Sequence, residues 1–179
     1  ASLDQISGGR SGWNLVTSNN EQDALNYSRE EHLSHGDRYD RAIEFADVVN
    51  GLWDSWDEDA FIRDKESGRF FDPAKMHVLD HKGRHFQVRG PLNVACSPQG
   101  RPVLVQAGAS GTGRDVAARL AELVFTAATT FEQAKEFYDD VRQRIPRFGR
   151  SQDQVKVMPG FYPVVAPTAS EAQEKYDYL

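Results

Sequence analysis

The sequence predicts an α/β protein with a parallel sheet, because short apolar strands alternate with amphipathic helices along most of the chain. Apolar strands begin near residues 102, 124 and 155. A glycine-rich turn opens a helix after the first of these strands, and further helices are expected over 131–148 and 169–179. This alternation favours parallel pairing with right-handed crossovers.

Composition and charge narrow the class of protein. The 179 residues carry a net charge of −6, which argues against a nucleic-acid partner, since that surface needs a basic stripe. No run approaches the roughly 20 apolar residues of a membrane span, and no signal peptide heads the sequence. The single cysteine, Cys96, excludes an internal disulfide and suits a reducing compartment. We therefore expect one cytoplasmic domain, residues 1–179, without a membrane partner.

The stretch "SGWNLVTS" at residues 11–18 reads as another strand but carries unusual polar residues. Asn14 lies near its start, and Thr17 and Ser18 lie at its end. A strand packed on both faces is normally almost continuously apolar. Either these polar groups bond to a neighbour in the core, or the end of the strand faces a ligand.

The stretch "RYDRAIEFADVVNGLWDSW" has apolar residues at helical spacing, which predicts an amphipathic helix of about four turns. We expect Asp37 to cap its N-terminus. His32, His35, Arg38 and Tyr39 gather near this helix start. They form either a solvated helix end or a cluster that binds an anion, and periodicity does not decide between the two.

Residues 57–101 are expected to form a long insertion that contains a β-hairpin. Its turn is predicted at Lys82-Gly83, with His81 opposite Arg84. His77, His81 and His85 are spaced by four, but no cysteine or carboxylate cluster accompanies them. They are therefore expected to be surface or strand-pairing residues rather than metal ligands.

The junction "VLVQAGASGTGRDVA" places Gly108, Gly111 and Gly113 between a strand and a helix. Such a turn can present backbone N–H groups and a helix dipole to a phosphate, with Ser110 or Thr112 adding a hydroxyl. The alternative is a tight turn that needs glycine for geometry alone. A dinucleotide site is not expected, because the next strand, "VFTAATT", lacks the carboxylate that binds a ribose.

No nucleophile or paired carboxylates stand out, a pattern that suits a protein whose cofactor supplies the chemistry. Catalytic residues therefore stay unassigned. Four stretches resemble, in this order, the nitrilotriacetate and dibenzothiophene-sulfone monooxygenases of the bacterial luciferase-like superfamily: "LDQISGGRSGWNLVTS", "RYDRAIEFADVVNGLWDSW", "FQVRGPLNVACSPQGRPVLVQAGASGTGR" and "AELVFTA". The resemblance runs over essentially the whole chain.

This resemblance implies a (β/α)₈ TIM barrel with FMN at the C-terminal ends of its strands. A separate NAD(P)H:flavin reductase would supply FMNH₂. A C4a-hydroperoxyflavin would then oxygenate a small organic substrate, often cleaving a C–N or C–S bond. Asn14, Thr17 and Ser18 would lie near the flavin ring and ribityl chain, and Tyr39 and the turn would bind the phosphate. The implied FMN-binding residues are Asn14, Thr17, Ser18, Tyr39, Gly108, Ala109 and Ser110.

A complete barrel needs eight strands and about 250 residues. Only four barrel strands are expected here, beginning at residues 11, 102, 124 and 155. We therefore expect a partial barrel, the middle of such an enzyme, which forms homo-oligomers and does not turn over substrate alone. Flavin-dependent oxygenation by the purified chain would contradict this last expectation. Two other interpretations stay open: a barrel that uses the deazaflavin F420 for hydride transfer, and a non-catalytic remnant with an exposed apolar surface.

Overall fold

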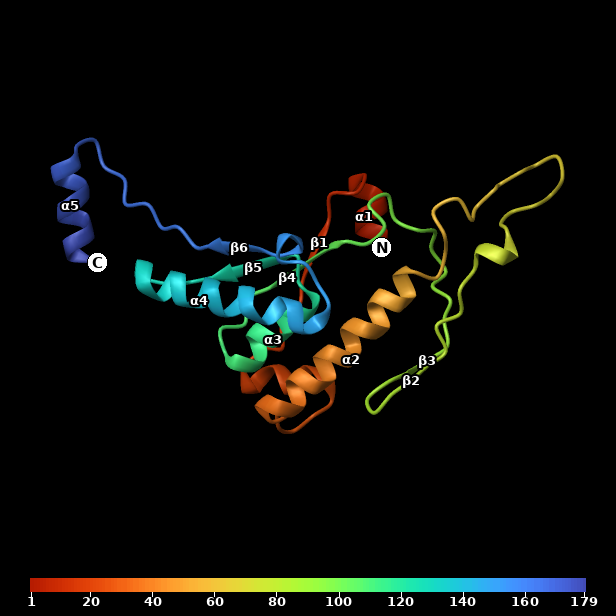
Figure 1. Ribbon diagram of the computed structural model, residues 1–179, viewed down its shortest axis with the longest axis horizontal. Helices are drawn as coiled ribbons and strands as arrows, with labels where there is room; N and C mark the ends of the chain where they lie inside the picture. Colours follow the sequence, from red (N-terminus) through yellow and green to blue (C-terminus); the bar gives the residue numbers. More distant parts are fainter.

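The computed structural model describes all 179 residues and is built around a four-stranded parallel sheet (Figure 1). Pairing confirms the predicted parallel arrangement, with each outer strand bonded on one side only. The strand "SGWNLVTS" is shorter than predicted, although the Leu15 N–H extends the ladder by donating to the Val105 carbonyl at 2.8 Å. The strands, in spatial order, are β1 (Gly12–Asn14), β4 (Val103–Gln106), β5 (Leu123–Thr126) and β6 (Lys156–Pro159).

The structure also contains five α-helices and four 3₁₀ turns. The helix predicted over 131–148 ends at Arg144, because Pro146 has no N–H to continue the α-helical ladder, and the chain tightens into a 3₁₀ turn. No helix is long and apolar enough to cross a membrane. The helices are α1 (Ser2–Ser7), α2 (His35–Trp53), α3 (Gly111–Leu120), α4 (Phe131–Arg144) and α5 (Ala169–Tyr178). The 3₁₀ turns are η1 (Glu21–Tyr27), η2 (Pro73–Lys75), η3 (Ile145–Phe148) and η4 (Gln152–Gln154).

The prediction that Asp37 caps α2 is wrong. Ser34 is the N-cap, and its hydroxyl oxygen accepts a hydrogen bond from the Asp37 N–H at 3.2 Å. The Ser34 hydroxyl in turn donates to the Asp37 carboxylate at 2.7 Å. Asp37 is the third helical residue, where its charge also interacts favourably with the helix dipole. The helix therefore begins one turn earlier than its apolar pattern suggests.

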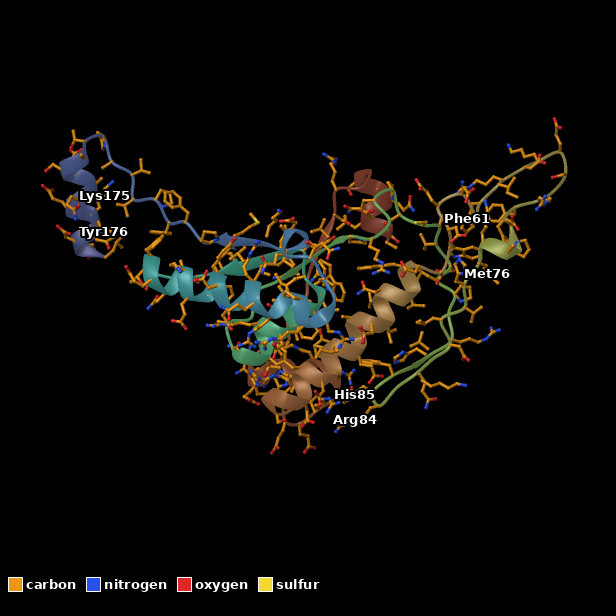
Figure 2. All side chains as sticks on the ribbon, viewed as in Figure 1. Phe61, Met76, Arg84, His85, Lys175 and Tyr176 are labelled. Atoms are coloured by element: carbon orange, nitrogen blue, oxygen red, sulfur yellow. The ribbon has the colours of Figure 1, made fainter.

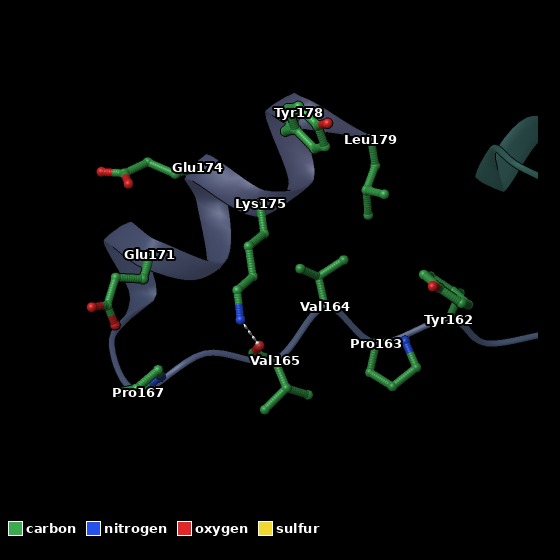
Figure 3. Close-up of a pocket in the computed structure, with 10 residues that line it drawn as sticks. All are labelled: Tyr162, Pro163, Val164, Val165, Pro167, Glu171, Glu174, Lys175, Tyr178 and Leu179. Atoms are coloured by element: carbon green, nitrogen blue, oxygen red, sulfur yellow. Dashed lines mark hydrogen bonds between the residues drawn. The ribbon is translucent and has the colours of Figure 1, made fainter.

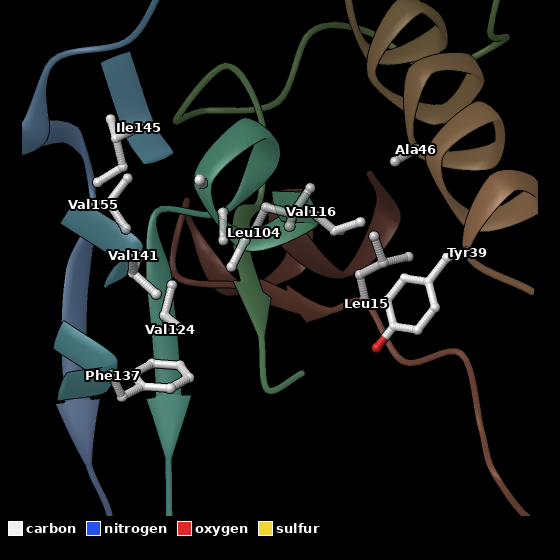
Figure 4. Close-up of a cluster of buried hydrophobic side chains, with 13 residues drawn as sticks. Leu15, Tyr39, Ala46, Leu104, Val116, Val124, Phe137, Val141, Ile145 and Val155 are labelled. Carbon is white, nitrogen blue, oxygen red and sulfur yellow. The ribbon is translucent and has the colours of Figure 1, made fainter. Parts of the chain in front are cut away.

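The core lies on one face of the sheet, between the strands and helices α2, α3 and α4 (Figure 4). Strand residues alternate in direction, so Leu104 and Val124 pack under the helices while Phe125 and Met158 stay exposed on the other face. The cluster comprises Leu15, Tyr39, Ala46, Leu104, Val116, Ala117, Ala118, Ala121, Val124, Phe137, Val141, Ile145 and Val155.

A buried carboxylate joins α1 to the start of β1. Asp4 has no exposed surface and accepts hydrogen bonds from the Ser11 N–H at 3.1 Å and the Ser11 hydroxyl at 2.8 Å. The Gln99 side-chain amide donates to the same oxygen at 2.6 Å. Because Gln99 lies just before β4, this one carboxylate fixes the chain segments from which two neighbouring strands begin.

The predicted hairpin is present, but its predicted register is wrong. Strands β2 (His81–Lys82) and β3 (Gln87–Val88) pair antiparallel with His81 opposite Val88, so residues 83–86 form a four-residue turn. Gly83 does not have the positive φ that a turn at Lys82-Gly83 would need. Arg84 and His85 lie at the hairpin tip (Figure 2). A contact with α2, described next, explains this longer turn.

Glu44 of α2 holds the hairpin tip. Its carboxylate accepts hydrogen bonds from the His85 N–H at 2.9 Å and the Phe86 N–H at 2.8 Å, and it contacts His81 Nε2 at 3.0 Å. Burial alone would raise the pKa of Glu44, but hydrogen bonds from His81, His85 and Phe86 together lower this pKa to about 2.

This shift predicts an acid-dependent release of the hairpin. A carboxyl group whose pKa falls from 4.5 to about 2 on folding stabilises the fold fully above pH 4.5 and loses that contribution as the pH approaches 2. We expect the amide protection factors of His85 and Phe86 in hydrogen exchange to fall across that window. In Glu44→Gln the protection factors of these two amides should be lower than in the parent chain, and they should not change with pH between 4.5 and 2. Equal protection at pH 5 and pH 2.5 in the parent chain would contradict this role for Glu44.

Candidate functional site

A groove of about 840 Å³ lies at the C-terminal end of β1, between the following loop and the first turns of α2. Asn14, Thr17 and Ser18 all line this groove. The Asn14 amide makes no hydrogen bond within the chain and is exposed. Its donor and acceptor are therefore available to a bound group.

Ser18 also has a structural role in this groove. Its backbone has a φ of 50°, and its hydroxyl donates to the Asp23 carboxylate in η1. The Asn20 side-chain amide donates to the same carboxylate at 3.2 Å. Ser18 therefore orders the loop that forms one wall of the groove.

The groove is lined by more positive than negative groups. Arg29, Arg38 and Arg41 form no ion pair, and Asp23 is the only acidic residue in the lining. His32 Nδ1 accepts the Leu33 N–H at 2.9 Å, while His32 Nε2 and Arg38 Nε are buried without a partner. This lining is complementary to an anionic group.

The glycine-rich turn forms the N-terminus of α3. The Ser110 hydroxyl oxygen caps the helix by accepting the Gly113 N–H at 3.1 Å, and the N–H groups of Gly111 and Thr112 have no partner in the chain. At the end of β4, the buried Gln106 side-chain oxygen accepts the Gly108 N–H at 2.7 Å. The turn thus presents free backbone donors at the positive end of a helix dipole.

Tyr39 of α2 reaches this turn. The side chain is buried in the core cluster and its ring contacts that of His35, with centroids 4.8 Å apart. A Cβ at Gly108 would lie 2.9 Å from the Tyr39 hydroxyl oxygen and 2.9 Å from the Gly113 Cα. The hydroxyl makes no hydrogen bond within the chain. A phosphate group fits here, because the turn supplies N–H donors and Tyr39 supplies a free O–H donor.

The structure brings the predicted site residues together in two groups. Tyr39, Gly108, Ala109 and Ser110 meet at the start of α3, while Asn14, Thr17 and Ser18 lie in the groove beside β1. Leu15 and Tyr39 belong to the same core cluster, which connects the two groups (Figure 4). Of the histidine and arginine cluster predicted near α2, His32 and Arg38 line the groove and His35 packs on Tyr39.

Sequence reasoning missed Gln106, which fixes the first glycine of the turn. The only signal for it was a polar side chain that ends an otherwise apolar strand, "VLVQ". Its neighbours in space explain why it is buried: the side-chain oxygen is used by Gly108, and the residue lies beneath the start of α3. It therefore fixes the conformation of the turn from within the protein.

The side chains of two of the three insertion histidines contact separate carboxylates. His77 Nε2 lies 2.8 Å from Asp57, and His81 Nε2 lies 3.0 Å from Glu44. His85 packs beside Phe86 at the hairpin tip. No group of three or more histidine, cysteine or acidic side chains is arranged to hold a metal ion.

A second hollow, of about 610 Å³, lies between α5 and the extended segment before it (Figure 3). Lys175 Nζ crosses the hollow and donates to the Val165 carbonyl at 3.1 Å. Most of its lining, including Tyr162 and Tyr178, is highly exposed. None of the predicted site residues lines it, and in Figure 1 it lies far from the start of α3.

Known proteins resemble this chain over its whole length. N-acetyl-S-(2-succino)cysteine monooxygenase of Bacillus subtilis is 55% identical over 179 residues, which are 100% of this chain and 41% of the relative. Nitrilotriacetate monooxygenase component A of Aminobacter aminovorans is 53% identical over 177 residues, 99% of this chain and 39% of the relative. The chain thus spans about two fifths of the length of these relatives.

Solved structures agree with this result. The crystal structure of long-chain alkane monooxygenase superposes with a TM-score of 0.92 at 41% identity, covering 98% of this chain and 41% of that one. Riboflavin lyase, solved with a modified FMN and riboflavin, superposes with a TM-score of 0.91 at 40% identity, covering 98% and 39%. The fold is therefore the luciferase-like α/β fold, present here as a partial parallel sheet of four strands. The luciferase-like monooxygenase family matches residues 1–179, and the chain belongs to that family.

Proposed function

We propose that this chain is the flavin-phosphate-binding part of an FMN-dependent monooxygenase. The whole enzyme would take FMNH₂ from a separate NAD(P)H:FMN reductase and use O₂ to oxygenate a small organic substrate, with cleavage of a C–N or C–S bond as the favoured outcome. Relatives named as monooxygenases support this activity, and a solved neighbour that holds a modified FMN supports the cofactor. Reduced FMN supplies the activation of O₂ when it is bound.

The residues of this chain would bind and orient that cofactor. The free N–H groups of Ser110, Gly111 and Thr112 would donate to the phosphate, as would the hydroxyls of Ser110 and Tyr39. The Asn14 amide would lie near the ring and ribityl chain, at the strand ends where barrel enzymes place their sites. The groove beside β1 would exclude part of the solvent from the substrate.

One observation carries this proposal: the free Tyr39 hydroxyl lies directly against the glycine turn, so close that a Cβ at Gly108 would be only 2.9 Å from its oxygen. The Tyr39 ring is buried, but its hydroxyl oxygen is reached by solvent and makes no hydrogen bond within the chain, so it is free to donate to a ligand beside the turn. A phosphate group beside the turn would accept hydrogen bonds from both the hydroxyl and the helix N-terminus.

Tyr39→Phe tests this arrangement. The change removes only an oxygen that bonds to nothing in the chain, so the free energy of unfolding should stay within about 0.5 kcal/mol of the parent value. A hydrogen bond to a charged group contributes about 1.5–3 kcal/mol, so the Kd for FMN should rise about ten- to a hundredfold. Flavin fluorescence quenching measures this Kd directly.

Tyr138→Phe serves as the matched control, because Tyr138 is a partly exposed residue of α4 and should leave FMN binding unchanged. Riboflavin, which lacks the phosphate, should bind the parent chain and Tyr39→Phe equally. An unchanged FMN affinity in Tyr39→Phe would contradict the proposed phosphate site. Tighter binding of F420 than of FMN by the parent chain would contradict the proposed cofactor.

A further inference from the structure

Two arginines bind carbonyl groups of the glycine-rich turn. Arg114 Nε donates to the Ala109 carbonyl at 3.0 Å, and Arg144 Nη1 donates to the Gly111 carbonyl at 3.0 Å. Arg114 belongs to α3 itself, but Arg144 comes from the last turn of α4, more than 30 residues away in sequence. The turn is therefore held from two helices.

Asp140 joins these two arginines. Its carboxylate accepts a hydrogen bond from Arg114 Nη1 at 2.9 Å and from Arg144 Nε at 3.0 Å, and Arg144 Nη1 also contacts Asp115 at 2.8 Å. The side chains of Arg114, Asp140 and Arg144 are 19–28% exposed, so water screens the network only in part. Burial opposes ionisation of Asp140, yet hydrogen bonds from the two arginines keep its pKa below the ordinary value.

These contacts fix the direction of the free N–H groups. In a planar trans peptide the C=O and the following N–H point in opposite directions. Because Arg114 holds the Ala109 carbonyl, the Ser110 N–H must point the other way, and the Arg144 contact with Gly111 does the same for the Thr112 N–H. Both N–H groups lack a partner within the chain.

We propose that Arg114, Asp140 and Arg144 are positioning residues that aim the N–H groups of Ser110 and Thr112 at the phosphate of the flavin. This inference rests on the proposed function. The three side chains act from the far side of the turn, through the carbonyl groups, and do not touch the phosphate. The network links α4 to cofactor affinity, although no α4 residue was predicted to belong to the site.

Asp140→Asn tests the proposal, because the lost negative charge and the lost arginine contacts predict opposite changes in FMN affinity. Loss of a negative charge near the turn would by itself strengthen phosphate binding. If Asp140 acts by holding the two arginines, its loss lets both carbonyl contacts loosen and weakens phosphate binding instead. We expect the Kd for FMN to rise about tenfold, equivalent to about 1.4 kcal/mol, while the Kd for riboflavin changes less than about twofold.

Asp139→Asn is the matched control, since the adjacent Asp139 pairs only with Lys135 on the exposed side of α4. It should leave the affinities for both flavins unchanged. Arg144→Lys provides a milder variant if Asp140→Asn fails to fold: it keeps the charge, but one ammonium cannot hold Asp140, Asp115 and the Gly111 carbonyl at once. An intermediate loss of FMN affinity, again without loss of riboflavin affinity, is expected.

Equal or tighter FMN binding by a folded Asp140→Asn or Arg144→Lys variant would overturn this inference. So would a parallel loss of FMN and riboflavin affinity, which would show a merely structural role. These results differ from a failure of the proposed function, in which the parent chain itself would bind FMN no better than riboflavin or would bind neither.

Discussion

Gly113→Ala is expected to disrupt the phosphate turn, whereas Gly111→Ala, two residues earlier in the same turn, is expected to be tolerated. A Cβ at Gly113 would lie 2.9 Å from the carbonyl carbon and the Cα of Gly108, and neither backbone atom can move without displacing the turn. Forcing a methyl group into such a packed site costs about 1–3 kcal/mol. The Kd for FMN should rise more than about tenfold, because Gly108 and the N–H groups move with the backbone.

Gly111→Ala is a closely matched control, because it makes the same substitution in the same turn. A Cβ at Gly111 meets nothing within 4 Å, and its φ is not positive, so alanine there should change the free energy of unfolding by less than about 1 kcal/mol and favour the helix. Urea denaturation with FMN titration measures both effects. Equal behaviour of the two variants would show that close packing of Gly108 on Gly113 does not shape the site.

Ser110→Asp is expected to separate the stability of α3 from its ability to bind phosphate. Aspartate caps helices about as well as serine, and its charge interacts favourably with the helix N-terminus. The free energy of unfolding should therefore stay within about 0.5 kcal/mol of the parent value. The carboxylate would, however, stand where the phosphate is proposed to bind, and like charges about 4 Å apart repel by about 4 kcal/mol near a protein surface.

We therefore expect FMN affinity to fall at least about a hundredfold in Ser110→Asp, with riboflavin affinity unchanged. Thr168→Asp makes a similar change at the N-cap of α5, a helix of the same length far from the site, and should affect neither flavin. Unfolding followed by circular dichroism checks stability, and isothermal titration calorimetry gives both affinities. An unchanged FMN affinity in Ser110→Asp would show that the phosphate binds elsewhere.

Features that depend on local sequence were predicted well. The runs "VLVQ" and "LVFT" form parallel strands, as their apolar character predicts, and the turn at Gly108 opens a helix because glycine permits the close approach of Gly113. The helix predicted over 169–179 is present as α5, and its N-cap, Thr168, which was not predicted, forms a capping box with Glu171. In each case the residues that decide the structure are neighbours in sequence.

Features that depend on distant contacts were not predicted. The hairpin register follows from Glu44, about 40 residues earlier, which binds the N–H groups of the turn and favours a four-residue connection. Asp140 and Arg144 carry no motif, and only the packing of α4 on α3 brings them to the glycine turn. Asn14 and Ser18 were singled out as polar residues in an otherwise apolar strand, but the partner of Ser18 in the loop, Asp23, was not predicted.

Native mass spectrometry of the chain with added FMN tests the central claim most directly. If Tyr39 and the start of α3 form a flavin-phosphate site, the 20.1 kDa chain, or a multiple of it, should carry one FMN per chain. Riboflavin at the same concentration should give a much smaller bound fraction, because the phosphate contacts are missing. A spectrum that contains only flavin-free chain, at FMN concentrations well above the micromolar range, would contradict the proposed site.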